Sequence, residues 1–115
     1  ETDGTTRSSY GDTYTANDII SVAMDLDNGN IYFYKNGTIQ NSGTAAFTDL
    51  VSAMPISGWC FYAFGFNDAQ VQLNTGNAPF SISSGNSDGA GHGNFEYSVP
   101  SGYFALCTKN LATYG

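Results

Sequence analysis

The residue types best suited to catalysis are sparse in this chain. His92 is the only histidine among 115 residues, so no pair of histidines can hold zinc. A nucleophilic triad would need this histidine to be oriented by an acid and to face an activated serine. The glycines around His92 leave it without rigid neighbours, which is typical of a solvated loop histidine. The sequence therefore predicts neither acyl transfer nor a zinc site.

Carboxylates are more numerous, but their spacing indicates turns. Asp25 and Asp27, followed by Gly29, resemble the start of a calcium loop, yet the glycine stands one position early and no glutamate closes the loop. The same two acids bracket an expected hairpin turn, and Glu96 is the only interior glutamate, so no pair suited to glycoside hydrolysis stands out. We predict no enzymatic activity, no metal and no cofactor.

The two cysteines carry little information by themselves. Cys60 lies in an aromatic run and Cys107 lies near the end of the sequence. One pair of cysteines can neither make a metal site nor identify an oxidising compartment. We predict two buried thiols in preference to a disulfide.

Aromatic side chains are better candidates for function, because they suit a binding surface. Alternation along residues 31–35 places Tyr32 and Tyr34 opposite Ile31 and Phe33, so one face of the expected hairpin carries two tyrosines. Tyrosine offers rigid contact area with a polar end, as protein-binding and sugar-binding surfaces require. The alternative is that a second sheet covers the pair. The remaining candidate binding residues are Trp59, Tyr62, Asp88 and His92.

Composition and charge favour one domain of strands joined by tight turns. Aromatic residues make up 15% of the chain, charged residues 11%, and glycine occupies 14 positions. Ten acids against three bases give a net charge of −7, and no cluster of cations is present to bind phosphates, so we predict no nucleic-acid partner. No stretch approaches the roughly 20 apolar residues of a membrane span, so we predict no membrane insertion.

The strongest local pattern is a three-stranded meander. Apolar residues recur at alternate positions in residues 20–26, which predicts a half-buried strand with its apolar side inward. Asn28-Gly29 then leads into residues 31–35, and a second Asn-Gly pair leads into residues 38–40. Asn-Gly supplies the positive φ angles of a two-residue hairpin turn, so the three strands should pair antiparallel.

Later segments are less regular. Residues 44–53 fit either a helical turn or a compact loop. The nearly continuous aromatic run at 59–66 predicts a central strand, and the alternation at 69–74 predicts the next one. The small and polar residues 83–94 predict a long loop. Residues 103–107 fit a final strand or an extended tail.

Three stretches carry a likeness to a known family. The first is residues 17–37, with an Asp-Leu-Asp-Asn-Gly turn and a Tyr-Phe-Tyr-Lys-Asn-Gly hairpin, and the second is the strand end at 71–80. They resemble the SPRY domain family. The third, residues 95–111, resembles the closing Pro-x-Gly-Phe-x-Ala-Leu-x-Thr-x-Asn-Leu of SPRY domains in bacteriophage tail and structural proteins. Eukaryotic members do not usually end in this way.

The resemblance implies an all-β fold, an antiparallel β-sandwich of the concanavalin-like jelly-roll type. SPRY domains usually begin with several strands, one of them rich in aromatics, that have no counterpart upstream of Glu1. We therefore expect residues 1–115 to form a single domain that lacks its N-terminal strands. Either a longer polypeptide or a neighbouring segment would complete the sandwich.

Three functions remain open on the sequence. The phage-like ending predicts a virion domain in a tail, fibre or capsid appendage, which contacts other virion subunits or a host-surface protein or glycan. That function implies a virion or extracellular location and an oligomeric assembly. The second possibility is a free-standing module that recognises peptide or carbohydrate. The third is a subunit of an extracellular filament, completed by a strand from its neighbour.

Overall fold

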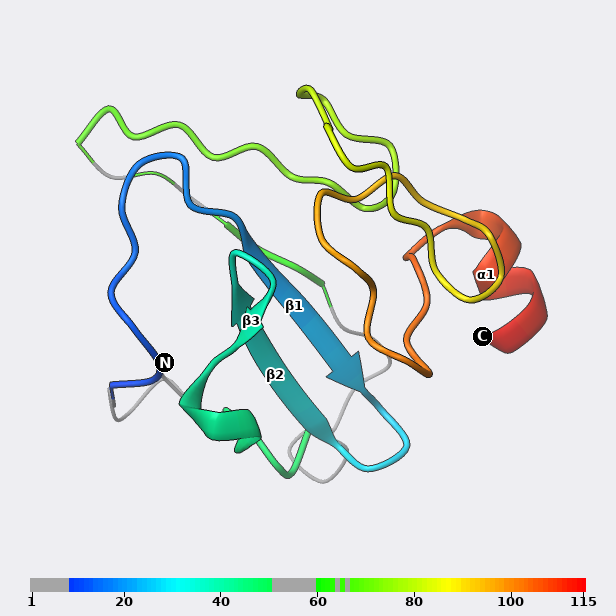
Figure 1. Ribbon diagram of the computed structural model, residues 1–115. Coiled ribbons are helices and arrows are strands. Elements are labelled where there is room, and N and C mark those ends of the chain that lie inside the picture. Colours follow the sequence, from blue (N-terminus) through cyan, green and yellow to red (C-terminus); the bar gives the residue numbers. More distant parts are fainter. Residues whose placement is uncertain (1–8, 51–59, 64, 66) are drawn as a thin grey trace. The chain divides into compact units, whose positions relative to one another are not determined.

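The computed structural model describes residues 9–50, 60–63, 65 and 67–115 (Figure 1). The chain divides into two compact units, Glu1–Pro55 and Ile56–Gly115, and each is described by itself. A three-stranded antiparallel sheet in the first unit and one short helix in the second are the main regular elements among these residues. The all-β fold class predicted from the sequence is confirmed by this β-rich structure.

The first unit contains the predicted meander. Strand β1 spans Ile20–Asp25, β2 spans Asn30–Lys35 and β3 spans Thr38–Ile39, in the order β1-β2-β3 with both pairs antiparallel. Figure 1 shows β2 between its two neighbours. A 3₁₀ turn at Asn41–Gly43 follows β3. Local turn chemistry therefore specifies this sheet correctly.

The two Asn-Gly pairs make different turns. Asn36 and Gly37 have φ angles of 49° and 79° and join the paired residues Lys35 and Thr38, which is the predicted two-residue turn. The first connection is instead four residues long, because pairing ends at Asp25 opposite Asn30, and Gly29 alone has a positive φ there. The prediction of a two-residue turn was wrong at this position. The Asp25 carboxylate accepts hydrogen bonds from the backbone and side chain of Asn28, which stabilises the longer loop.

The sheet exposes the side that was expected to be buried. Ile20, Val22 and Leu26 are between 41% and 46% exposed, whereas Ala23, on the opposite face of β1, is only 5% exposed. A sheet face becomes buried only when a second layer covers it. In the described part of this unit, the ring of Tyr10 packs against the exposed apolar face, where it meets Phe33 edge-on with the ring centroids 5.7 Å apart. The predicted burial of these side chains was therefore wrong.

Residues 44–50 form a loop that runs back along β2. Phe47 makes an isolated bridge with Ile31, and the backbone N–H of Leu50 donates to the carbonyl of Gly29 at 3.0 Å. Leu50 is 4% exposed and, with Ala23, is one of the few buried apolar residues in the described part of this unit. The loop alternative is correct for residues 44–50, and residues 51–53 lie outside the described part of the chain.

The second unit has little regular structure in its described residues. The strand predicted at 69–74 is absent, and its apolar members Val71 and Leu73 are 53% and 59% exposed. Of the run 59–66, residues 60–63 and 65 are irregular and exposed, and the others lie outside the described residues. Alternation alone does not form a strand, because each strand needs a partner to satisfy its backbone groups. The long loop at 83–94 is confirmed, with one bridge between Asn86 and Phe95.

A short helix, α1, spans Thr108–Tyr114 and was not predicted. It follows residues 103–107, which form no strand and turn tightly where the N–H of Cys107 donates to the carbonyl of Ala105 at 2.8 Å, so the final strand is absent there. Gly115 closes the helix by donating its N–H to the carbonyl of Leu111 at 3.0 Å. Seven residues make a marginal helix in isolation, so packing must support it. Tyr114 stacks on Phe104 with ring centroids 4.2 Å apart.

The segment before β1 is fastened to the second hairpin turn. The Asp18 carboxylate accepts hydrogen bonds from Thr15 and from the side chain of Asn36, and it lies 3.3 Å from the Lys35 ammonium group. The Asn36 side-chain oxygen accepts the N–H of Ile19 at 2.9 Å. The hydrogen bonds from Thr15 and Asn36, aided by Lys35, lower the pKa of Asp18 to about 2.

These contacts predict that Asn36 contributes more to the stability of the fold than Asn28, the asparagine of the first Asn-Gly pair. We expect Asn36→Ala to lower the free energy of unfolding by about 2 kcal/mol, because alanine is strained at positive φ and two side-chain hydrogen bonds are lost. Asn28→Ala, at the exposed first turn, is the matched control and should cost about 0.5 kcal/mol or less. Urea unfolding of both variants measures the difference, and equal losses would contradict the assignment.

Candidate binding site

The predicted tyrosine pair shares one face of the sheet. Register places Tyr32 opposite Ala23 and Tyr34 opposite Ser21, on the face away from Phe33. Both tyrosines are half-buried. Burial, together with the neighbouring hydroxyls of Tyr32 and Tyr10, raises the pKa of Tyr34. The expected geometry of the pair is therefore present, and its binding role stays a prediction.

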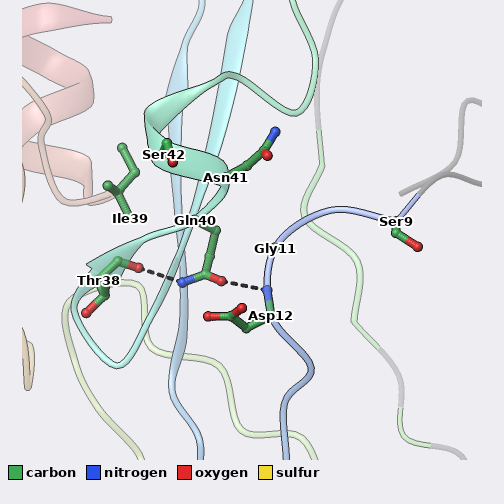
Figure 2. Close-up of a pocket in the computed structure, with 8 residues that line it drawn as sticks. All are labelled: Ser9, Gly11, Asp12, Thr38, Ile39, Gln40, Asn41 and Ser42. Atoms are coloured by element: carbon green, nitrogen blue, oxygen red, sulfur yellow. Dashed lines mark hydrogen bonds between the residues drawn. The ribbon is translucent and has the colours of Figure 1, made fainter.

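A polar hollow lies beside β3, and sequence reasoning did not find it (Figure 2). Its volume is about 560 Å³. Hydroxyl, carboxamide and carboxylate groups dominate a lining that consists of Ser9, Gly11, Asp12, Thr38, Ile39, Gln40, Asn41 and Ser42. Such groups donate and accept hydrogen bonds in many directions. This arrangement suits a ligand rich in hydrogen-bonding groups, such as a peptide backbone or a sugar.

Gln40 fixes the wall of the hollow. Its side chain is 7% exposed, its Oε1 accepts the N–H of Asp12 at 2.8 Å, and its Nε2 donates to the carbonyl of Thr38 at 3.0 Å (Figure 2). A Cβ atom added to Gly11, which has φ 70°, would lie 2.8 Å from Gln40 Oε1, so the close approach requires glycine. The amide of Gln40 thus joins segments 28 residues apart.

The rim of the hollow is strained backbone. Asn41, Ser42 and Gly43 have successive φ angles of 52°, 53° and 81°. Glycine adopts this region easily and asparagine tolerates it, but serine rarely enters it. Three left-handed residues in succession turn the chain sharply after β3, and the first two of them, Asn41 and Ser42, line the hollow. The run Asn-Ser-Gly signals a turn in the sequence, but not the concavity that the turn creates.

The side chain of Asp88, in the second unit, accepts four hydrogen bonds. Its Oδ1 accepts the backbone N–H groups of Ala90 and His92, both at 2.9 Å. Its Oδ2 accepts the N–H of Ala105 at 2.8 Å and the side-chain amide of Asn110 at 2.7 Å. Burial opposes ionisation of this carboxyl, but the four hydrogen bonds outweigh it and lower the pKa of Asp88 to about 2.

This network connects the glycine-rich loop with the closing segment of the unit. A carboxylate has about four acceptor positions, and all four of Asp88 are occupied. Asn110, which is 5% exposed, also donates to the carbonyl of Ala105 at 2.8 Å. We call these three residues, Asp88, Ala105 and Asn110, the aspartate clasp. Asp88 thus holds two segments of the second unit together. Its direct role in ligand binding stays a prediction.

Residues 85–89 read Gly-Asn-Ser-Asp-Gly, a match to Gly-x-Ser-x-Gly that our sequence prediction overlooked. In hydrolases this motif forms a sharp turn between a strand and a helix, and its serine is activated by a histidine that an acid orients. Here the exposed Ser87 lies in a loop, with no helix directly after it. Asp88 meets His92 through the main-chain N–H rather than through the imidazole. The motif at residues 85–89 therefore lacks the strand–turn–helix geometry and the oriented histidine that make it catalytic in hydrolases.

The other predicted site residues do not gather in one place. His92 is half-buried within the loop that Asp88 holds, and Tyr62 is 82% exposed. Trp59 lies outside the described residues. Tyr32 and Tyr34 belong to the first unit, and Tyr62, Asp88 and His92 belong to the second. Their binding roles stay predictions.

Both cysteines are free thiols. Cys60 is exposed because residues 60–63 do not form the predicted central strand, so the prediction of a buried thiol was wrong there. Cys107 is half-buried. Among residues 9–50, 60–63, 65 and 67–115, no three metal-binding side chains gather. No helix in the same residues has the length and apolar character to cross a membrane.

The SPRY domain is the protein family whose model matches this sequence, over residues 2–78. The chain belongs to the SPRY domain family. The match covers about two thirds of the chain, including the meander and most of the second resembling stretch, and it ends before residues 95–111. SPRY domains are protein-interaction modules and are generally non-catalytic. No curated protein and no solved structure matches the chain in the corresponding comparisons.

Asn110 gives the most direct test of the aspartate clasp in this SPRY domain. We expect Asn110→Ala to lower the free energy of unfolding by about 2 kcal/mol, because a buried carboxylate oxygen and the Ala105 carbonyl both lose a donor. Thr113→Ala on the exposed side of α1 is the control and should change it by about 0.5 kcal/mol or less. Equal values in chemical denaturation would show that the clasp is not a stabilising contact.

The strongly lowered pKa values of Asp18 and Asp88 predict a loss of stability in acid. Asp18 and Asp88 have folded-state pKa values of about 2, below the ordinary 3.8, so the unfolded chain takes up their protons first as the pH falls. Their contribution is complete above about pH 4 and is lost between pH 4 and 2. The urea midpoint measured from pH 7 to 2 should fall in this window. It should fall less steeply in Asp88→Asn, and parallel curves for the two proteins would contradict the prediction.

Proposed function

We propose that this SPRY domain is a non-catalytic interaction domain of a bacteriophage virion. In this function it contacts other virion subunits or a host-surface protein or glycan. Family membership supports an interaction role, because SPRY domains bind proteins. The phage role depends on the closing stretch 95–111, whose pattern resembles that of phage structural proteins.

The aspartate clasp is the observation that carries this proposal. Two positions of the closing pattern, Ala105 and Asn110, supply two of the four hydrogen bonds that Asp88 accepts. The pattern is therefore tied to one physical requirement in this chain, since position 110 must carry a side-chain donor, whereas every residue except proline can donate the main-chain N–H at position 105.

The polar hollow favours a second candidate function. Its hydroxyl, amide and carboxylate lining suits a free-standing module that recognises a peptide or a carbohydrate through loops. Buried Gln40 holds the wall in place before any ligand arrives, which reduces the entropy lost on binding. This module would act without being part of a particle.

Quantitative mass spectrometry of gradient-purified particles distinguishes the two functions. We expect peptides of this chain at a constant ratio to an established capsid protein across the particle peak, because a structural subunit has a fixed copy number. An abundant host cytosolic protein, followed through the same gradient, is the control for contamination. If the chain is absent from the particles, or its ratio falls together with the control, the virion proposal is wrong and the free-standing module is favoured.

A further inference from the structure

The two edges of the three-stranded sheet differ. On the side of β2 that faces away from β1, the chain itself takes up the main-chain groups. The carbonyl of Phe33 accepts the N–H of Gln40 at 2.9 Å, and Ile31 donates to Phe47 and accepts from Ala46. On the other side β1 is the outer strand, and β2 is its neighbour (Figure 1). In the described part of the chain, no strand lies against the outer edge of β1.

The register shows which main-chain groups of β1 face outward. In an antiparallel pair, the hydrogen-bonding groups of successive residues point to opposite sides of the strand. Asn36 donates its N–H to the carbonyl of Ile19, so the main chain of Ile19 faces β2. By alternation, the N–H and C=O groups of Ile20, Val22 and Met24 point away from the sheet. No hydrogen bond from another described residue reaches them there.

The outer edge of β1 lacks the features that usually keep an edge strand from pairing. Natural sheets protect their edges with lysine, proline, a bulge or a covering segment. Residues 20–24 read Ile-Ser-Val-Ala-Met, without charge or proline, and they pair with β2 without a bulge. Ile20 and Val22 are also 44% and 41% exposed, so the residues with outward main chain present apolar side chains as well.

This combination selects an extended polypeptide as the occupant. A strand presents N–H and C=O groups at the same two-residue period as β1, and its alternate side chains would lie beside Ile20 and Val22. Charge narrows the choice further. Residues 9–50 carry five acids against one lysine, and Asp25 and Asp27 stand at the end of β1. A basic residue in the partner strand is therefore attracted to this end.

The same charges disfavour a second copy of the chain. If two β1 strands paired antiparallel about Val22, Asp25 of one copy would lie opposite Ile19 of the other, next to Asp18. Like charges brought together across paired strands are destabilising. Each copy also has a net charge of −7, which opposes association at longer range.

We propose that the outer edge of β1 binds an extended segment of a basic partner protein by antiparallel strand addition. Apolar residues at alternate positions of that segment lie opposite Ile20, Val22 and Met24. A lysine or arginine of the segment lies near Asp25 or Asp27. The inference deepens the proposed function and rests on it, since it names the kind of segment that the interaction domain recognises. Antiparallel addition is favoured because it is slightly more stable per residue than parallel addition.

Fluorescence polarisation with labelled synthetic peptides tests this contact. The probe is Lys-Lys-Val-Thr-Val-Thr-Val with blocked ends, whose valines lie opposite the outward residues of β1. In antiparallel addition the N–H groups of the valines point to β1 and those of the threonines point away. Methylating the valine nitrogens should therefore weaken binding at least about tenfold, because each loses a donor. Methylating the threonine nitrogens is the matched control and should change binding less than about threefold.

A second probe tests the charge of the partner. Replacing both lysines of the peptide with glutamate should weaken binding about tenfold or more, because the first unit is acidic. Raising the ionic strength from about 0.05 to 0.5 M should bring the two peptides closer in affinity, since salt screens both attraction and repulsion. Equal affinities at low salt would contradict the choice of a basic partner.

Val22 locates the contact on the protein. Val22→Pro removes an outward N–H that the sheet does not use, and proline is tolerated at such edge positions, so the chain should still fold. We expect this variant to bind the lysine probe at least about tenfold more weakly. Val22→Thr keeps both the N–H and the β-branched shape, and it should stay within about threefold of the wild type. Near-UV circular dichroism confirms that each variant is folded.

The outcomes separate this inference from the proposed function. Absence of probe binding by the folded chain, or equal losses from the two methylated peptides, would overturn strand addition at β1. A dimer of the chain that competes with the probe would show a second copy at the edge and would also overturn it. If the chain has a fixed ratio in particles but does not bind the probe, the virion role survives alone. If it binds as expected but is absent from particles, strand addition stands and the virion role fails.

Discussion

The second unit depends on one buried carboxylate. In its described residues no sheet ladder satisfies the backbone, so another acceptor must hold the segments together. Asp88 accepts three main-chain N–H groups and one side-chain amide, which brings the loop at 88–92 against residues 105–110. Hydrogen bonds to a charged acceptor are stronger than those between neutral groups, so one ionised side chain can replace several ladder bonds. Without it, the loop, residues 103–107 and α1 have no common anchor among the described residues.

In the first unit, too, polar side chains hold backbone segments together by hydrogen bonds. Asp18 accepts from Thr15, Asp25 accepts from Asn28, and the amide of Gln40 joins Asp12 to Thr38. Some of the acidic residues of this chain thus stabilise its structure by accepting hydrogen bonds. Side chains of this kind compete with regular secondary structure for backbone groups. Their abundance is a physical reason why so much of the described chain is ordered without being helix or strand.

The limits of sequence reasoning follow from the range of each interaction. The meander was predictable because adjacent residues encode it, as Asn36-Gly37 does. The hollow was not, because the Gln40 contact that shapes it joins positions 28 residues apart, and no local pattern announces such a contact. Alternation at Val71 and Leu73 predicted a strand wrongly, since an alternating pattern specifies which face of a strand would be buried but not which strand it would pair with. Helix α1 carried a closing glycine signal, yet its seven residues were too few to be recognised.

The small buried apolar set links binding to stability. Among the described residues, those that are both apolar and buried are Ala23, Leu50 and Ala105, each 4–5% exposed, which is a small set for the described part of the chain. Large side chains such as Phe104 and Tyr114 keep much of their surface in water, so the apolar area removed from water on folding is modest. A partner that covers such side chains adds the missing burial and stabilises the folded state by mass action.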